Sequence, residues 1–95
     1  MERNEIERII IDILKDYYEV QGINEEVSGS TRLFGRDSSL NSMGLVNIVV
    51  DVESKFMEMG HEISLMSENA MSRSKSPFVS VSSLADFIKE QISSN

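Results

Sequence analysis

Apolar residues recur at helical spacing in three separate stretches of the chain. In the first stretch, from about Asn4 to Glu19, they lie three or four positions apart, which is typical of one face of an α-helix. These residues are Ile6, Ile9, Ile10, Ile13, Leu14 and Tyr17. Asn4 is followed three positions later by Glu7, a variant of the capping box, so we predict that Asn4 caps this helix. Gly22 is predicted to end it.

The second stretch is predicted to begin just after Asn41 and Ser42 and to stop at Gly60. Many of its residues are β-branched, which would permit a strand, but the spacing of its apolar residues and its length favour a helix. The apolar residues at this spacing are Leu45, Ile48, Val49, Val52, Phe56 and Met59.

The third stretch is a final helix that Ser82 or Ser83 is predicted to cap, with Asp86 in its first turn. Its apolar residues are Leu84, Phe87, Ile88 and Ile92. Before it, the Ser-rich segment 67–83 contains the single proline of the chain and is predicted to hold at most a short helix, around Leu65 to Met71.

A polar stretch from Gln21 to Asn41 separates the first two predicted helices. A loop of about 20 residues without structure of its own is uncommon in a compact domain and is usually functional. Taken together, the pattern predicts an all-α fold, a small bundle of three main helices plus one short helix. We expect residues 1–95 to form a single domain.

The composition narrows the classes of function. The 95 residues carry 9 Lys and Arg against 16 Asp and Glu, a net charge of −7, and the basic residues are scattered singly. A chain of this kind lacks the basic stripe that binds phosphate backbones, so we expect no nucleic acid among its partners and favour proteins with basic surfaces. The absence of Cys excludes a disulfide scaffold, a thiol nucleophile and a Cys-ligated metal.

Few residues are candidates for catalysis. The single histidine, His61, follows Gly60 at a predicted helix end, where a solvated or capping role is favoured over that of a base or ligand. The carboxylates of the second helix lack the spacing of a metal site. We therefore do not expect an enzyme. No stretch approaches the roughly 20 apolar residues of a membrane span, and no signal sequence is evident, so a cytoplasmic protein is expected.

The start of the second helix carries the most informative motif, Leu40-Asn41-Ser42-Met43. It resembles the acyl carrier protein family, in which a long first helix and a long loop lead to an Asp-Ser-Leu or Asp-Ser-Met motif at the head of the second helix. Residues 62–64 and 81–88 also look like the family's later segments, so the resemblance covers essentially the whole chain. Flanking residues that fall where the family's would are Leu40, Leu45, Val46, Glu53 and Phe56.

The resemblance implies a specialised, discrete carrier whose Ser42 receives 4′-phosphopantetheine from coenzyme A. A phosphopantetheinyl transferase would attach the arm, and acyl groups would be held on it as thioesters. Such a carrier is usually a monomer, and it delivers its cargo to acyl-loading and acyl-transfer enzymes of lipid or secondary-metabolite synthesis, which have basic docking surfaces. Asn41 departs from the family's Asp and removes a negative charge. Asp37-Ser38 imitates the motif, but the apolar stripe begins three residues after Ser42, which favours Ser42.

Partner recognition in this family runs largely along the second helix. Its outward positions are predicted to be Met43, Asn47, Asp51, Ser54 and Glu58, a mildly acidic face. A flank of Val46, Val50, Glu53 and Met57 is interpreted first as the edge of the core, with a docking patch as the alternative. The candidate partner-binding residues are Asn41, Met43, Val46, Asn47, Asp51, Glu53 and Glu58.

Two alternatives remain open from the residues alone. Asn41 or Ser42 could serve only as the N-cap of the second helix, because short polar residues are common there. In that case the chain would be a small helical interaction adaptor without a cofactor, docking through its second helix. A carrier gains mass on Ser42, whereas an adaptor does not.

Overall fold

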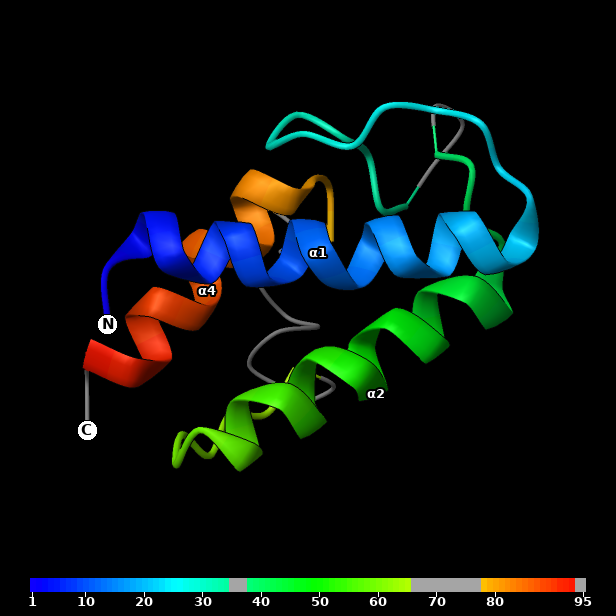
Figure 1. The fold of residues 1–95 in the computed structure, drawn as a ribbon. Coiled ribbons are helices and arrows are strands. Elements are labelled where there is room, and N and C mark those ends of the chain that lie inside the picture. Colours follow the sequence, from blue (N-terminus) through cyan, green and yellow to red (C-terminus); the bar gives the residue numbers. More distant parts are fainter. Residues whose placement is uncertain (35–37, 66–77, 94–95) are drawn as a thin grey trace.

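The computed structural model describes residues 1–34, 38–65 and 78–93, which form three α-helices and no strand. The helices are α1 (Arg3–Gln21), α2 (Ser42–Glu58) and α4 (Val81–Ser93), shown in Figure 1. The prediction of three main helices is therefore confirmed. The predicted short helix around Leu65 to Met71 lies, from residue 66 onward, outside the described residues, and Leu65 itself is not helical.

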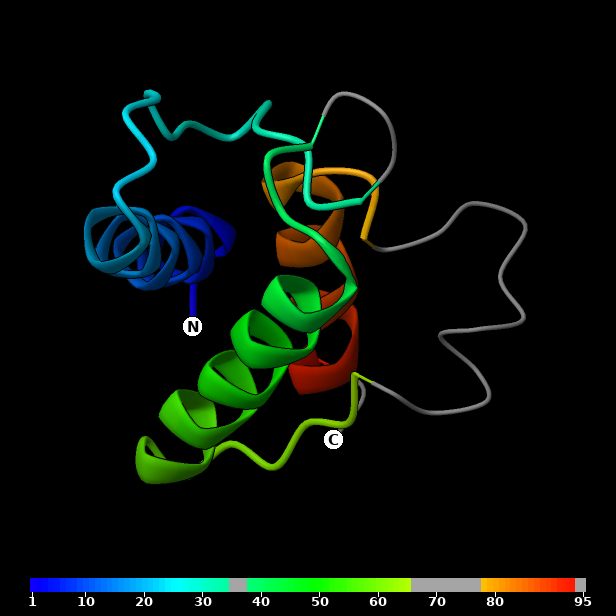
Figure 2. The ribbon, with the colours of Figure 1, turned by 90° about the vertical axis from the view of Figure 1, so that its right-hand side faces the viewer.

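α1 runs across the molecule and packs against both other helices (Figures 1 and 2). Along it, one stripe of side chains is buried, consisting of Ile6, Ile10, Leu14 and Tyr18. α2 and α4 add their own apolar faces, and all side chains buried among the described residues are apolar. Full burial of one such side chain stabilises the fold by about 1.5–3 kcal/mol, so the paired stripes account for the arrangement of the helices. The buried residues of α2 and α4 include Ile48, Val49, Val52, Phe56, Leu84 and Ile88.

The start of α1 differs from the prediction, whereas its end agrees. The N-cap is Glu2, whose side chain makes no capping hydrogen bond, and Asn4 lies inside the helix, so the predicted Asn4 cap is wrong. Arg3 is drawn into the first turn because its side chain binds α4, as described below. Gly22 ends the helix in the left-handed conformation (φ 73°), where a residue without Cβ is favoured, as predicted.

α4 begins at Val81, earlier than the predicted caps. Ser80 caps it: its hydroxyl oxygen accepts from the Ser83 N–H at 3.2 Å and its carbonyl accepts from the Leu84 N–H at 3.0 Å. Ser82 and Ser83 therefore lie within the helix, and the prediction that one of them caps it is wrong. Asp86 falls in the second turn and not in the first.

The long loop between α1 and α2 covers the start of α4. The Thr31 carbonyl accepts from the Val81 N–H at 3.0 Å, and the Gly29 carbonyl accepts from the Ser82 N–H at 2.8 Å. Arg32 also forms an isolated antiparallel bridge with Ser80. With the Ser80 cap, the first four N–H groups of α4 all have acceptors within the protein, so this helix end is fully hydrogen-bonded to the loop and to its own cap.

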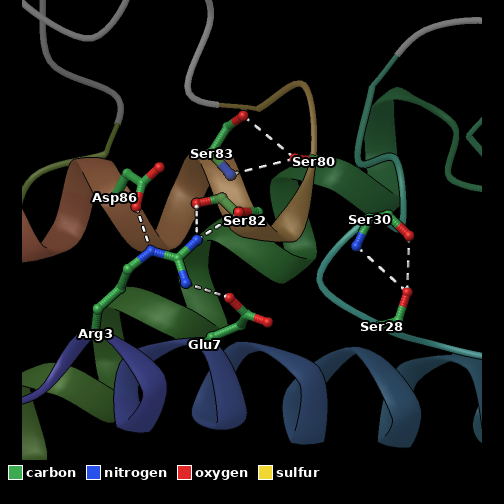
Figure 3. A network of polar contacts seen from close by, with 8 residues as sticks. All are labelled: Arg3, Glu7, Ser28, Ser30, Ser80, Ser82, Ser83 and Asp86. Atoms are coloured by element: carbon green, nitrogen blue, oxygen red, sulfur yellow. Dashed lines mark hydrogen bonds and ion pairs between the residues drawn. The ribbon is translucent and has the colours of Figure 1, made fainter.

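Arg3 joins the first turn of α1 to α4 (Figure 3). Its guanidinium donates to the Asp86 carboxylate, to the Ser82 hydroxyl, to the Ser82 carbonyl at 3.2 Å and to Glu7 at 2.6 Å. The hydrogen bond to Asp86 is the main reason that the pKa of Arg3 is raised; burial acts in the opposite direction, and Glu7 raises the pKa further. Because these side chains are partly exposed, their charge pairing adds little to the free energy of unfolding.

α2 ends at Glu58, two residues before the predicted stop. Met59 is its C-cap, and Gly60 follows with φ 88°. The backbone N–H of His61 donates to the Phe56 carbonyl at 2.8 Å, which closes the helix end. None of the helices in the described parts of the chain is long and apolar enough to cross a bilayer.

Candidate functional site

Asn41 builds the first turn of α2. It adopts an extended conformation, and its side-chain oxygen accepts from the Gly44 N–H at 2.8 Å. Its carbonyl accepts from the Leu45 N–H at 2.9 Å. Asn41 is therefore the N-cap, which confirms that alternative for Asn41 and excludes it for Ser42. The amide oxygen makes the capping hydrogen bond that a carboxylate would make, without the negative charge.

Gly44 allows this turn to lie directly against α1. A Cβ atom at Gly44 would lie 2.9 Å from the Tyr17 hydroxyl, 3.3 Å from Cδ2 of Leu40 and 3.4 Å from Oδ1 of Asn41. A larger residue at this position would require either the Tyr17 side chain or α2 to shift. Sequence reasoning did not single out Gly44 as part of the site, and its only local signal is a glycine in the first turn of an otherwise apolar helix.

Ser42 is the first residue of α2 and is exposed to solvent. Among the described residues, its hydroxyl makes no hydrogen bond, and neither its own N–H nor that of Met43 has an acceptor. The hydroxyl is thus accessible to another molecule, next to two unengaged N–H groups at the positive end of the helix dipole. This environment suits a negatively charged group bound to Ser42.

The neighbouring serines are engaged, in contrast to Ser42. The Ser38 hydroxyl oxygen accepts from the Leu40 N–H at 3.0 Å, and the Ser39 hydroxyl donates to the Glu25 carboxylate. The motif-like pair Asp37-Ser38 begins outside the described residues, because residues 35–37 are not described. Of these three serines, Ser42 has the hydroxyl that is free to react.

Ser39, in the loop that leads to Ser42, is bonded to both Tyr18 and Glu25. Tyr18 is buried in the core at 3% exposure. Burial raises its pKa, and the nearby Glu25 carboxylate raises it further, while a hydrogen bond with Ser39 acts in the opposite direction. The neutral phenol is therefore the form present at physiological pH. Its hydrogen bond with Ser39 holds Ser39 beside α1, and Ser39 in turn binds the Glu25 carboxylate.

The predicted outward face of α2 is confirmed. Met43 is the most exposed of its large apolar residues, with 82% of its surface accessible. The other outward positions are all exposed, namely Asn47, Asp51, Ser54 and Glu58.

The flank predicted as the edge of the core is instead at the surface. Val46, Val50 and Met57 are 51%, 52% and 64% exposed, so the core interpretation is wrong for these three residues. Glu53 differs from them because it is half-buried, and its carboxylate accepts from the Leu65 N–H at 3.3 Å. That hydrogen bond gives Glu53 a structural role in holding the segment after α2.

The arrangement leaves the beginning of α2 without charge. No charged residue occurs from Ser42 to Val50, and Asp51 is the first acid along the helix. At a rise of 1.5 Å per residue, Asp51 lies about 13 Å along the axis from Ser42. The candidate residues Asn41, Ser42, Met43, Val46 and Asn47 thus share one uncharged end of the helix.

The rest of the described surface was searched for metal sites and hollows. In the described parts of the chain, no three His, Cys, Asp or Glu side chains are placed to hold a metal ion. An open hollow of about 400 Å³ lies beside the start of α4, between Arg32 and Ser83, and a second of about 620 Å³ lies along α1 near Glu7. Neither hollow includes Ser42.

Comparisons of the chain with protein-family models, curated proteins and solved structures found no match. Any assignment of function therefore depends on the residues of this chain and on the resemblance of its motif.

Proposed function

We propose that this chain is an acyl carrier protein that holds acyl groups as thioesters on a 4′-phosphopantetheine arm attached to Ser42. The observation that carries the proposal is the Ser42 hydroxyl, exposed and unengaged at the start of α2, while Asn41 does the capping. The motif Asn41-Ser42-Met43, the order of the helices and the length of the chain support it.

The attachment would be a phosphoryl transfer to the Ser42 hydroxyl. Its Oγ forms a bond to the phosphorus of coenzyme A that bears pantetheine, and the bond from that phosphorus to the bridging pyrophosphate oxygen breaks. Adenosine 3′,5′-bisphosphate leaves, and the serine proton passes to a base of the transferase. The resulting phosphodiester lies beside the free N–H groups of Ser42 and Met43, which would offset its charge. The bound arm supplies the thiol that the chain itself lacks.

The partners in this proposal are a phosphopantetheinyl transferase and the enzymes that load and remove acyl groups. They would act in lipid or secondary-metabolite synthesis in the cytoplasm, with the chain serving as a monomeric substrate and not as an enzyme. The net charge of −7 favours partners with basic surfaces, which would be steered toward the chain over long range.

Intact mass spectrometry tests the proposal. The protein is incubated with coenzyme A and a broad-specificity phosphopantetheinyl transferase, beside Ser42→Ala, Ser38→Ala and Ser39→Ala variants and a known carrier. We expect the mass of one phosphopantetheine group on the wild type and on the Ser38 and Ser39 variants, and none on Ser42→Ala. If the known carrier is modified and this chain is not, the proposal is contradicted and the adaptor alternative is favoured.

A further inference from the structure

We infer that Ser39 positions the Ser42 hydroxyl for attack on coenzyme A by fastening the loop before α2 to the end of α1. We call Ser39 and its two partners, Tyr18 and Glu25, the loop clasp. Ser39 acts through the chain that leads to Ser42, so it is a positioning residue and not a catalytic one. The inference rests on the proposed function and assigns a role to a neighbouring serine that the reaction itself does not use.

The loop clasp joins residues that are far apart along the chain. The Ser39 hydroxyl donates to the Glu25 carboxylate, 14 residues earlier, and it is also hydrogen-bonded to the Tyr18 phenol. The Tyr18 carbonyl accepts from the Ile23 N–H at 2.8 Å, so Tyr18 holds the long loop near both of its ends. Tyr18 is buried, whereas Ser39 and Glu25 are exposed. The clasp therefore fastens a surface loop to a side chain that close packing fixes in the core.

A second contact fixes the chain just beyond Ser42. A Cβ atom at Gly44 would lie 2.9 Å from the Tyr17 hydroxyl, so the first turn of α2 packs directly on α1. Ser39 is three residues before Ser42 and Gly44 is two residues after it, which leaves at most about 11 Å and 7 Å of chain between Ser42 and these two points. The Ser42 hydroxyl makes no hydrogen bond of its own within the described residues. Its position therefore depends on the supports on either side.

The position of this hydroxyl matters because phosphoryl transfer depends mainly on alignment and on stabilisation of charge. The Oγ atom of Ser42 has to lie in line with the bond that breaks between the phosphorus and the bridging pyrophosphate oxygen. If the loop clasp is opened, the turn samples more positions, and a smaller fraction of the bound carrier has this alignment. Loss of the clasp should therefore slow the chemical step more than it weakens binding to the transferase.

Single-turnover kinetics with coenzyme A and an excess of the broad-specificity transferase test the inference. Quenched samples are analysed by intact mass, which gives the maximal rate of adduct formation and the transferase concentration at half of that rate. We expect Ser39→Ala to lower the maximal rate about 5-fold, with the half-saturating concentration within about 2-fold of the wild-type value. The variant still gains the arm at long times. Ser39→Thr keeps the hydroxyl and should restore most of the rate.

The contribution of the buried tyrosine is measured by a double-mutant cycle. Tyr18→Phe removes the phenol that is bonded to Ser39 and should also lower the maximal rate. The double variant Tyr18→Phe, Ser39→Ala should be no slower than Ser39→Ala, because both changes remove the same hydrogen bond. Circular dichroism shows whether each variant is folded, and Ser39→Ala keeps the test valid if Tyr18→Phe is not, because residue 39 is exposed.

Glu25 and Glu26 offer a matched pair of acids. Both are exposed in the loop, but within the described residues only Glu25 has a hydrogen-bond partner. Glu25→Ala should lower the maximal rate about 3-fold or more, while Glu26→Ala, with the same loss of charge, should stay within about 2-fold of the wild type. Glu25→Gln keeps an oxygen that can accept from Ser39 and should retain most of the rate. A carboxylate that instead docked the transferase by its charge would raise the half-saturating concentration in both Glu25 variants and leave Ser39→Ala unaffected.

The inference and the proposed function fail on different results. A maximal rate for Ser39→Ala within about 2-fold of the wild type, or equal losses for Glu25→Ala and Glu26→Ala, would overturn the inference, while the adduct on Ser42 still supports the proposed function. Absence of any wild-type adduct after prolonged incubation, with a known carrier modified under the same conditions, would remove the proposed function and the inference with it.

Discussion

The cap at Asn41 allows a quantitative prediction about the turn that presents Ser42. Asn41→Ala removes the acceptor of the Gly44 N–H, a hydrogen bond of 2.8 Å, while its carbonyl still accepts from Leu45. Loss of an Asn cap destabilises a protein by about 1 kcal/mol. For a domain of 60–100 residues this corresponds to a fall in Tm of about 4–8 °C.

Asn41→Asp should act in the opposite direction. The carboxylate keeps an oxygen for the Gly44 N–H and adds a negative charge at the positive end of the α2 dipole, which is worth about 0.3–1 kcal/mol. Because the capping hydrogen bond and the helix dipole stabilise the charged form of the new carboxyl in the folded protein, its pKa lies below its unfolded value of about 3.9. The gain is therefore complete above that value and is lost as pH falls through the folded pKa.

Thermal unfolding followed by circular dichroism measures both effects. At neutral pH we expect the order Asn41→Asp, wild type, Asn41→Ala from highest to lowest Tm, and the advantage of the Asp variant should shrink in high salt. A matched exposed control is Asn47→Ala, because Asn47 caps no helix; its free energy of unfolding should stay within about 0.5 kcal/mol of the wild-type value. An Asn41→Ala variant as stable as the wild type would refute our description of the first turn.

Two further predictions concern α1. Gly44→Ala should destabilise the fold by about 1–3 kcal/mol, because the new Cβ would lie 2.9 Å from the Tyr17 hydroxyl, and by less in a Tyr17→Phe background that lacks this hydroxyl. Urea unfolding of the wild type, both single variants and the double variant measures this difference, and an equal loss of stability in both backgrounds would contradict the packing of Gly44 on Tyr17. Burial raises the pKa of Tyr18. The stabilisation by the neutral Tyr18 phenol should therefore be complete below the pKa of tyrosine in the unfolded chain, about 10, and be lost as pH rises through the folded-state pKa. The midpoint of urea unfolding should fall more steeply from neutral to strongly alkaline pH for the wild type than for Tyr18→Phe.

The helices were predictable because their apolar spacing is a local property. The buried positions of α2, from Ile48 to Phe56, follow directly from the pattern, and so does the exposed face that begins at Met43. The width of the buried face was not predictable. Val46 and Val50 are apolar, but they are more than half exposed, because the helix that packs against α2, α1, covers only part of its surface. Hydropathy along one helix does not record how far its neighbours extend around it.

The errors at helix ends have one physical cause, which is pairing between residues far apart in sequence. Arg3 begins α1 early because its guanidinium binds Ser82 and Asp86. Of several serines with similar capping ability, Ser80 caps α4 because it is bridged to Arg32 in the loop. Local capping rules rank the candidates, but they contain no information on which one a distant segment holds in place.

The candidate site was predictable in position but not in detail. The motif located Ser42 at the head of α2, and the structure places it there with an exposed side chain. The close approach of Gly44 to Tyr17 and the hydrogen bond between Glu53 and Leu65 both join separate segments. Such contacts leave no periodic signal in the sequence. The spacing of residues therefore assigned Glu53 to the partner surface, although its carboxylate also holds the Leu65 backbone.

The path of α1 separates the two ends of the molecule. Its first turn is joined to α4 through Arg3, near the N- and C-terminal labels in Figure 1, and its last turns lie against the head of α2 through Tyr17 and Gly44. At 1.5 Å per residue, the 19 residues of α1 span about 28 Å. A dye, an affinity tag or a solid support attached near residue 1 or residue 93 would therefore sit a full helix length from Ser42. The protein is well suited to immobilised assays, in which enzymes approach the serine from the opposite side.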